Sequence, residues 1–464
     1  MPVPFFEMMK KNETYIARCT GYTEDGAGVV RIDGFVVFVK GLMIDEEAEI
    51  GIMAVKKNHG YGRIVRLIEP SKDRIEPVCT VSGPCGGCSL QHMNDHGQRY
   101  FKEEKVRNCF RANAGMEADI LPILRSEPYF NYRNKVQVPV QYNNGKVEMG
   151  FYQNHSNRII NYDTCAVQSE LSNRMTLFLK EQFAHFRCAD NIRHVLIKHA
   201  HVTGQVMVVL VVRKHPFDKE KELVEKTVKE FPEIRSFLAI ENRREDNVIL
   251  DGKEYVLYGD EYIEEELLDC RFRISARSFF QINPYATRIL YSKALEFAGL
   301  SGKETVIDLY CGTGTIGILA SKHAKKVYGI EIVADAVRDA KVNARINDAD
   351  NIEFLNMDAS RGAQAVIRSK IKTDCIIVDP PRKGCSKDTL DAIIKISPKR
   401  LVYVSCDPST LARDVKILCE NGFSVEKIQP VDMFPQTVHV ETVCCLYRQK
   451  KDFISVPYEP KNVE

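Results

Sequence analysis

Apolar and polar positions follow two different patterns along the chain, and the change falls near residue 271. Beyond it, short apolar runs alternate with segments whose apolar residues recur every three or four positions, as in "IVADAVRDAKVNARIN". The first pattern is typical of buried strands and the second of amphipathic helices. Their alternation predicts an α/β domain over residues 271–464, with a doubly wound, Rossmann-like parallel sheet. Its ligand is expected at the carboxyl ends of the strands.

The N-terminal part has another pattern. Residues 15–68 contain five short runs rich in β-forming residues, separated by turns such as "EDGAG" and "IDG". This arrangement predicts a small, OB-like antiparallel β-barrel within residues 1–70. Such barrels often bind oligonucleotides across one face.

The middle part, residues 71–270, mixes the two patterns and is expected to be an α+β domain. We expect a charged amphipathic helix around residues 94–113 and a β-hairpin with "VTGQ" at its turn. The segment "EKELVEKTVKEF" has the spacing of a further helix. The sequence therefore predicts three domains.

Composition and charge bear on the binding partners and the cellular compartment of the protein. The chain has 464 residues, with 65 Lys and Arg against 63 Asp and Glu, so its net charge of +2 announces neither nucleic acid nor membrane. The longest aliphatic run, residues 206–212, is too short to span a bilayer, and "MPVPFFEMMKK" has no cleavable signal pattern. We expect a cytoplasmic protein with no membrane partner and no obligate protein partner. Its fifteen cysteines are then reduced thiols, available as metal ligands or nucleophiles.

A glycine-rich turn follows the first predicted strand of the C-terminal domain. In "DLYCGTGTIG", Gly312, Gly314 and Gly317 fit G-x-G-x-x-G, and Glu331 ends the next strand, where a carboxylate can accept both hydroxyls of a ribose. These features indicate an adenosine-containing cofactor. NAD is one alternative. However, Asp379 begins "DPPRKG" at the end of the fourth strand. The two prolines hold the chain extended there, which a dehydrogenase does not need. S-adenosylmethionine fits better.

Cys406 ends the fifth predicted strand, in the crevice that Glu331 and Asp379 also border. A free cysteine is most often a small buried hydrophobe, but its place at the mouth of the strand favours a nucleophile. Carbon 5 of uracil is too weak to attack a sulfonium methyl, whereas thiolate addition at carbon 6 places negative charge on carbon 5. A base must afterwards remove the carbon-5 proton, and Glu441, which follows "DMFPQTVHV", is the candidate.

Five motifs lie in order over residues 275–441: "SARSFFQINP", "DLYCGTGTIG", "DPPRKG", "VSCDPSTLARD" and "DMFPQTVHVE". In these motifs the chain resembles the uracil-5 RNA methyltransferases, which act on ribosomal and transfer RNA. The resemblance implies that Cys406 attacks the base and that Glu441 takes the proton. It also implies cofactor contacts from Gln281, Tyr310, Glu331 and Asp379, with Asp358 placed to reach the adenine.

One position departs from that family. Asp407 follows the nucleophile, where members often have Asn, and this affects local hydrogen bonding rather than the chemistry. Arg413 and Asp414 are expected to brace the nucleophile loop, and His439 to be a structural neighbour.

A second group of cysteines lies near the end of the barrel. Cys79, Cys85 and Cys88 have the spacing C-x5-C-x2-C in a Gly- and Pro-rich loop, and Cys165 is an isolated candidate for a fourth thiolate. This spacing predicts a metal site but leaves zinc and iron–sulfur open. The ribosomal members of the resembled family carry a [4Fe-4S] cluster on this pattern and an N-terminal TRAM barrel, and the resemblance therefore implies a structural [4Fe-4S] cluster.

The segment "YFNYRNKVQVP" mixes aromatic and basic residues, and Tyr132, Arg133 and Lys135 are the candidates for RNA contacts. Because a stacked, paired uridine hides its carbons 5 and 6, the target must be unpaired or flipped out. The barrel and the four cysteines together favour 23S ribosomal RNA as the substrate. Transfer-RNA uracil-5 methylation and RNA cytosine-5 methylation are the near alternatives. A non-catalytic iron–sulfur RNA-binding protein is the alternative from another class.

Overall fold

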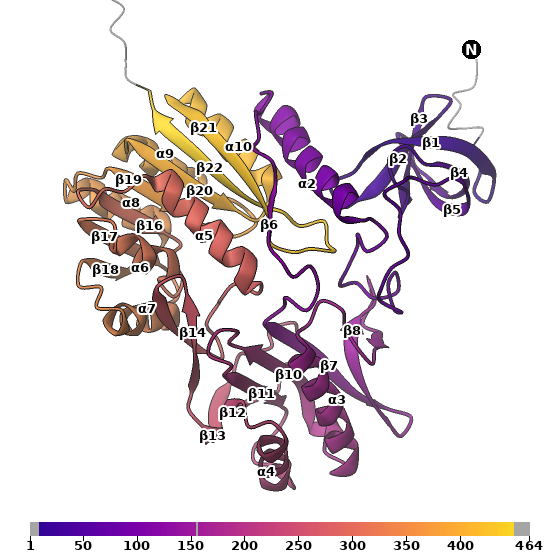
Figure 1. The fold of residues 1–464 in the computed structure, drawn as a ribbon, viewed down its shortest axis with the longest axis horizontal. Coiled ribbons are helices and arrows are strands. Elements are labelled where there is room, and N and C mark those ends of the chain that lie inside the picture. The colour runs from indigo at the N-terminus through magenta and orange to yellow at the C-terminus, as the bar shows by residue number, and fades with distance from the viewer. Residues whose placement is uncertain (1–8, 155, 450–464) are drawn as a thin grey trace, which may run out of the picture.

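Residues 9–154 and 156–449 are described by a computed structural model of the chain, which contains a small barrel and two large sheets (Figure 1). The N-terminal barrel closes in the strand order β1-β2-β3-β5-β4. Its strands are β1 (Thr14–Tyr22), β2 (Ala27–Ile32), β3 (Phe35–Lys40), β4 (Glu47–Val55) and β5 (Gly60–Glu69). Aliphatic side chains such as Val30, Val37 and Ile50 fill its interior and are fully buried. The predicted five-stranded barrel is present, but β3 and β5 pair in parallel, so it is not antiparallel throughout.

The middle part contains a seven-stranded sheet in the order β13-β12-β11-β10-β7-β8-β9. Its strands are β7 (Lys135–Asn143), β8 (Lys146–Tyr152), β9 (Ile159–Asn161), β10 (Ile192–His199), β11 (Val206–Val212), β12 (Ile234–Glu241) and β13 (Lys253–Gly259). Its helical elements are α3 (Glu170–His185), η2 (Ala189–Asn191) and α4 (Glu220–Glu230). The expected hairpin is the antiparallel pair β10 and β11. Within the described residues, no helix is both long and apolar enough to cross a membrane.

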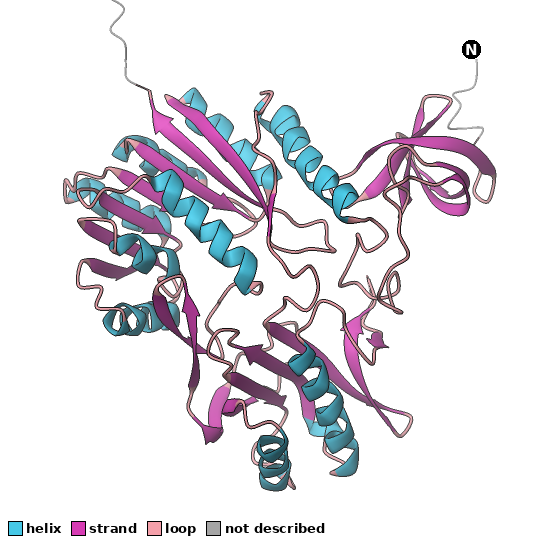
Figure 2. Ribbon diagram, viewed as in Figure 1, coloured by secondary structure: helices cyan, strands magenta, loops and turns pink. Residues whose placement is uncertain are grey.

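The C-terminal part is built on an eight-stranded sheet in the order β18-β17-β16-β19-β20-β22-β21-β6. Its strands are β6 (Leu124–Arg125), β16 (Thr305–Leu309), β17 (Lys326–Glu331), β18 (Ile352–Asn356), β19 (Cys375–Val378), β20 (Arg400–Ser405), β21 (Phe423–Asp432) and β22 (Glu441–Arg448). Its helices are α5 (Pro284–Ala298), α6 (Thr315–Ser321), α7 (Ala334–Ile346), α8 (Ala359–Arg368), α9 (Lys387–Ile396) and α10 (Pro408–Glu420). Strands β16 to β20 pair in parallel, and helices cover the sheet (Figure 2). The predicted doubly wound α/β fold is confirmed.

The end of the chain departs from a purely parallel sheet. Strand β22 inserts between β20 and β21 and is antiparallel to both. The hairpin β14 (Tyr262–Leu267) and β15 (Cys270–Ser275) forms a separate two-stranded sheet, and the amide of Arg273 donates to Asn343 of α7. The C-terminal region therefore receives structural support from residues before 271.

Helix α2 (Asp95–Cys109) and the π-helical turn η1 (Phe110–Ala114) also join the C-terminal sheet rather than the middle domain. Val106 and Phe110 share a buried core with Leu411 of α10. Lys102 of α2 is fully buried, and its Nζ lies 2.5 Å from Oδ1 of Asp432 at the end of β21. Figure 1 shows α2 lying between the barrel and strands β21 and β22. The spatial parts of the molecule therefore do not coincide with three consecutive stretches of sequence.

Candidate active site at the carboxyl edge of the sheet

A cavity of about 660 Å³ opens at the carboxyl ends of the C-terminal parallel strands. It lies where an open α/β sheet is expected to hold its ligand. The structure brings seven of the residues singled out from the sequence to its wall: Gln281, Tyr310, Gly312, Glu331, Asp379, Cys406 and Glu441. Because these residues come from six separate segments, their convergence is a property of the fold.

The glycine turn after β16 leaves room for a ligand. Tyr310 and Gly312 have φ values of 65° and 54°, and a Cβ built on Gly312 would meet no atom within 4 Å. The Gly312 amide donates to Oε2 of Glu331 at 3.0 Å, and the Val333 amide donates to Oε1 of Glu331 at 2.8 Å. Glu331 is thereby held in place with further acceptor capacity on both oxygens. Such a turn with an adjacent fixed carboxylate fits an adenosine ribose.

Cys406 occupies the single position between strand β20 and the cap of helix α10. Asp407 is the N-cap, and its Oδ1 accepts hydrogen bonds from the amides of Ser409 at 2.9 Å and Thr410 at 3.1 Å. Pro408 follows at the first helical position, where its fixed φ suits the helix and its missing N–H costs nothing. The stretch "CDPS" thus ends the strand and starts the helix within two residues. Asn would cap equally well, so Asp407 differs from it mainly by its negative charge.

Antiparallel pairing of β20 with β22 brings the second candidate to the same place. Ser405 pairs with Thr442 in this ladder, and one step further along each strand lie Cys406 and Glu441. Glu441 is only 4% exposed and lines the same cavity as Cys406. This register could not be predicted from the sequence, because 34 residues separate Cys406 from the start of β22.

Burial dominates the electrostatics of the cavity. It raises the pKa of Asp379 to about 7 and that of Glu441 to about 8, where the nearby Asp379 carboxylate adds to the shift. Burial, followed by the charges of Glu441 and Asp379, raises the pKa of the Cys406 thiol to about 12. Asp308, fully buried below the turn, also has a pKa well above its usual value. The cavity thus favours neutral acids until a positive charge enters it.

The loop before Glu441, residues 433–440 and here named the base loop, is fixed by hydrogen bonds to its carbonyl groups. The donors are Asn283 Nδ2 to Met433 O (3.0 Å), Lys102 Nζ to Phe434 O (3.0 Å), Tyr132 Oη to Pro435 O (2.9 Å), the Ser89 and Leu90 amides to Gln436 O (3.0 Å each) and Lys105 Nζ to Val438 O (3.1 Å). These donors come from the cysteine-rich loop, helix α2, the start of the middle domain and the cap of α5. Residues from all over the chain therefore position the approach to Glu441.

The "DPPRKG" segment is tied to helix α10. Oδ2 of the fully buried Asp414 accepts hydrogen bonds from the Cys385 amide at 2.8 Å and from the Tyr403 hydroxyl at 2.6 Å. Arg413 donates to the carbonyl oxygen of Lys383 at 2.9 Å. Arg413 and Asp414 therefore connect the loops that carry Asp379 and Cys406, which is the bracing role expected from the sequence.

Some residues are placed differently from the cofactor prediction, and others were missed. Asp358 does not line the described cavity. Its Oδ1 instead caps α8 by accepting a hydrogen bond from the Ser360 amide at 2.9 Å. Gly314 also lies outside the wall, and a Cβ there would meet Phe354 at 2.8 Å, so this glycine serves close packing. No ligand contact was predicted for Phe279, which lines the cavity with 65% of its surface exposed. The doubled Phe in "SARSFFQINP" was the available signal.

The four candidate metal ligands line a second, smaller cavity of about 70 Å³. They are the free cysteines Cys79, Cys85, Cys88 and Cys165. Among the described residues, no three His, Cys, Asp or Glu side chains form a group suited to a single ion. Arg133 also lines this cavity, and its buried Nε has no hydrogen-bond partner. A set of soft ligands with an unpaired cationic donor suits an anionic group larger than one ion.

The structure corrects one of the predicted RNA contacts. Tyr132 is 1% exposed, and its hydroxyl donates to the base loop, so its ring has no face open to a nucleobase and the stacking prediction is wrong for this residue. Arg133 faces the cysteine cavity. Lys135 begins β7 and is half-buried. The aromatic and basic mixture in this segment therefore reflects packing at least as much as a binding surface.

Comparison with known proteins agrees with the fold and cavity. Residues 98–449 match the family model described as tRNA (Uracil-5-)-methyltransferase. An RNA methyltransferase of Clostridium tetani is 41% identical over 453 residues, covering 96% of this chain and 98% of the relative, and one of Bacillus cereus is 41% identical over 452 residues, covering 96% and 98%. Both are named only as uncharacterized RNA methyltransferases.

Among solved structures, the tRNA (uracil-54, C5)-methyltransferase of Pyrococcus abyssi, in complex with S-adenosyl-L-homocysteine, superimposes with a TM-score of 0.73. It is 26% identical, and the match covers 93% of this chain and 99% of that one. The fold and the cavity define an S-adenosylmethionine-dependent RNA methyltransferase. More specifically, the chain belongs to the RNA uracil-5 methyltransferase family.

The raised pKa of Glu441 predicts a pH-dependent cost to folding. An acid whose pKa is higher in the folded state stabilises that state fully below its unfolded pKa, and this contribution is lost as pH rises through the folded value. For Glu441→Gln, the free energy of unfolding relative to wild type should therefore rise by about 1.4 kcal/mol per pH unit between the ordinary glutamate pKa of 4.5 and about 8. Urea unfolding at several pH values measures this difference.

The control is Glu225→Gln on helix α4, where the side chain is 66% exposed. Its stability should follow that of the wild type at every pH. Parallel pH profiles for wild type and Glu441→Gln would show that Glu441 does not carry this linkage.

Proposed function

We propose that the protein methylates carbon 5 of a uridine in large-subunit 23S ribosomal RNA through a covalent bond between Cys406 and carbon 6 of the base. The observation that carries this proposal is the meeting of Cys406 and Glu441 at one end of the β20–β22 ladder, within a cavity that Glu331 and Asp379 also line. A nucleophile and a base on opposite strands of one ladder suit a reaction that needs both at adjacent ring carbons.

The steps follow from the roles of these two side chains. The Cys406 thiol gives its proton to water and its sulfur bonds to carbon 6, so that the electron pair of the C5–C6 double bond moves onto carbon 5 and the carbonyl oxygen of carbon 4. Carbon 5 then bonds to the methyl group, and the electron pair of the broken sulfur–methyl bond stays on the donor, which leaves as a neutral thioether. The Glu441 carboxylate removes the remaining carbon-5 proton, the double bond forms again, and the sulfur leaves as a thiolate.

The charges of the cavity suit a cationic methyl donor. S-adenosylmethionine supplies the methyl group and a positive sulfonium. Asp379 and Glu441, whose pKa values are raised in its absence, gain a favourable charge partner when they ionise beside it. Glu331 and the open space over Gly312 hold the ribose side of the molecule. With a pKa near 8, Glu441 is close to the ideal value for a base at neutral pH.

For the second cavity we propose a [4Fe-4S] cluster held by Cys79, Cys85, Cys88 and Cys165. Zinc–sulfur bonds of about 2.3 Å would draw four sulfurs around one point. Here the thiols surround a space of about 70 Å³, which suits a multi-atom cluster better. The cluster would brace the loop whose Ser89 and Leu90 amides hold Gln436.

The identity of the RNA has two candidates. The barrel and the cysteine set support ribosomal RNA through the resemblance of both to ribosomal members of the family. Transfer RNA is the second candidate, because the Pyrococcus abyssi enzyme, which matches 93% of this chain, is named for tRNA. Both substrates require an unpaired or flipped uridine.

The covalent mechanism predicts a trapped complex. On RNA that carries 5-fluorouridine, the wild type should form a denaturant-stable adduct in the presence of S-adenosylmethionine, because fluorine cannot leave as a proton. Cys406→Ala should form none. Gel electrophoresis under denaturing conditions measures the adduct, and failure of the wild type to trap a demonstrated substrate RNA would contradict the thiol mechanism.

Glu441→Gln provides the matched comparison in the same assay. It should accumulate the methylated adduct on ordinary RNA, because sulfur addition and methyl transfer precede the step that needs the carboxylate. Unhindered turnover by this variant would exclude Glu441 as the base.

The substrate proposal predicts that labelled methyl groups enter unmodified 23S rRNA at least about tenfold faster than unmodified tRNA, since the specific contacts of a matched site are worth about 1–3 kcal/mol each. Nucleoside analysis should give 5-methyluridine. Preferential labelling of tRNA would replace the ribosomal proposal with the transfer-RNA one, and 5-methylcytidine would contradict both.

The cluster proposal predicts about four iron atoms and about four acid-labile sulfides per chain after anaerobic purification. Cys88→Ser should lower both contents, whereas Cys188→Ser, a buried cysteine outside this cavity, should leave them unchanged. Stoichiometric zinc without sulfide would contradict the iron–sulfur assignment.

A further inference from the structure

A lysine of helix α2 connects the base loop to the N-terminal barrel. This lysine takes part in none of the proposed chemical steps. Lys105 of helix α2 donates from Nζ to the carbonyl oxygen of Glu24 at 2.9 Å and to that of Val438 at 3.1 Å. Glu24 lies in the turn between β1 and β2, and Val438 lies three residues before Glu441. One ammonium group therefore joins the barrel to the base loop.

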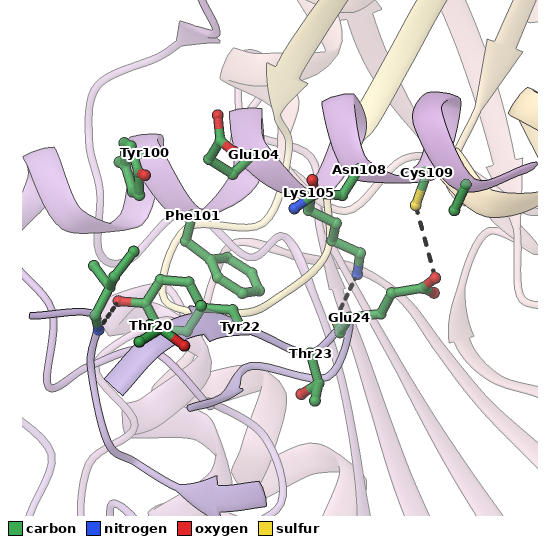
Figure 3. A pocket seen from close by; sticks show the side chains of 13 residues that line it. Thr20, Tyr22, Thr23, Glu24, Tyr100, Phe101, Glu104, Lys105, Asn108 and Cys109 are labelled. Carbon is green, nitrogen blue, oxygen red and sulfur yellow. Dashed lines mark hydrogen bonds between the residues drawn. The ribbon is translucent and has the colours of Figure 1, made fainter. Parts of the chain in front are cut away.

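Figure 3 shows this junction from close by. Lys105 extends from α2 toward Glu24, and nearby the rings of Tyr22 and Phe101 pack edge to face against each other. Burial lowers the pKa of Lys105, and the negative groups around it, including Glu24 and Asp407, oppose that effect. A half-buried cation that donates to two carbonyl groups forms strong hydrogen bonds that are costly to lose.

The same turn also contacts the base loop directly. Gly26 has a φ of 84°, and a Cβ on this residue would meet Cγ1 of Val438 at 2.8 Å. Only glycine allows the turn to approach so closely without moving Val438. The barrel thus touches the base loop by close packing as well as through Lys105.

We propose that Lys105 is a positioning residue for Glu441, and that the β1–β2 turn of the barrel is a structural part of the active site. By fixing Val438 against the barrel, Lys105 sets where the base loop enters β22 and hence where the Glu441 carboxylate lies relative to Cys406. This inference rests on the proposed role of Glu441 as the base. RNA held by the barrel is then held in register with the proton-abstraction step.

The variant Lys105→Met removes both hydrogen bonds and keeps most of the side-chain volume. Adduct formation with 5-fluorouridine RNA should stay within about twofold of wild type, because the steps up to methyl transfer do not need Glu441 in place. Turnover on ordinary RNA should fall about tenfold or more, as expected for the loss of charged hydrogen bonds, and KM should change little. The methylated adduct should accumulate, as with Glu441→Gln.

Two lysine-site controls separate positioning from general damage. Lys105→Arg should retain most of the turnover, since a guanidinium can donate to both carbonyls and a neighbouring cavity of about 340 Å³ leaves room for it. Arg107→Met, on the same helix but paired with Glu103 and Glu104, should behave as wild type.

A second pair of variants tests the junction from the barrel side, and remains informative if Lys105→Met does not fold. Gly26→Ala should accumulate the methylated adduct because its Cβ displaces Val438. Gly34→Ala is the matched control, since Gly34 has the same φ of 84° in the same barrel but open space around its Cβ position. Val438→Ala should partly restore the turnover of Gly26→Ala.

The outcomes distinguish the two levels of the proposal. If wild type forms no adduct on substrate RNA, the proposed mechanism fails. If wild type forms the adduct but Lys105→Met and Gly26→Ala lose adduct formation as much as turnover, or keep full turnover, the positioning role is overturned while the mechanism stands.

Discussion

Antiparallel pairing between β20 and β22 is the constraint on which the site depends. In a purely parallel sheet, the ligand-binding side chains at one edge would all come from the carboxyl ends of their strands. No side chain at the beginning of a strand would reach that edge. Reversal of the last strand brings the beginning of β22 to that edge, and with it Glu441 beside Cys406. The loops after the parallel strands β16, β17 and β19 line one part of the cavity, and β20 and β22 bring Cys406 and Glu441 together in another.

Desolvation then gives these side chains their chemical character. Asp308 and Glu441 are buried and Asp379 is partly buried, and each of the three acids has a pKa above its ordinary value. Burial of carboxyl groups without partners costs folding free energy. The apolar clusters packed against the sheet offset this cost. The folded state is thus destabilised at the cavity by its own carboxyl groups.

Much of the fold could be predicted because its signals are local. Periodicity identified the barrel strands and the alternating strands and helices, and strand ends followed by Gly, Asp or Cys identified Gly312, Asp379 and Cys406. The position of α2 against β21 could not be predicted, since amphipathic spacing shows that a helix has a buried face but not what covers it. The burial of Tyr132 was missed for a related reason: its partner, Pro435, is 303 residues away. The capping role of Asp358 competed with a ligand role at the same strand end.

The contacts that hold the base loop also govern when the enzyme becomes complete during synthesis. Lys102 and Asp432 are 330 residues apart, and the side chains of Gln98 and Gln436 bond across 338. A nascent chain can form the barrel early, but α2 waits for its partner strand until translation has passed β22. Contacts at such separation form late, because closing long loops is entropically costly. A partly synthesised chain therefore lacks the contacts that hold the base loop, although its barrel has already left the ribosome.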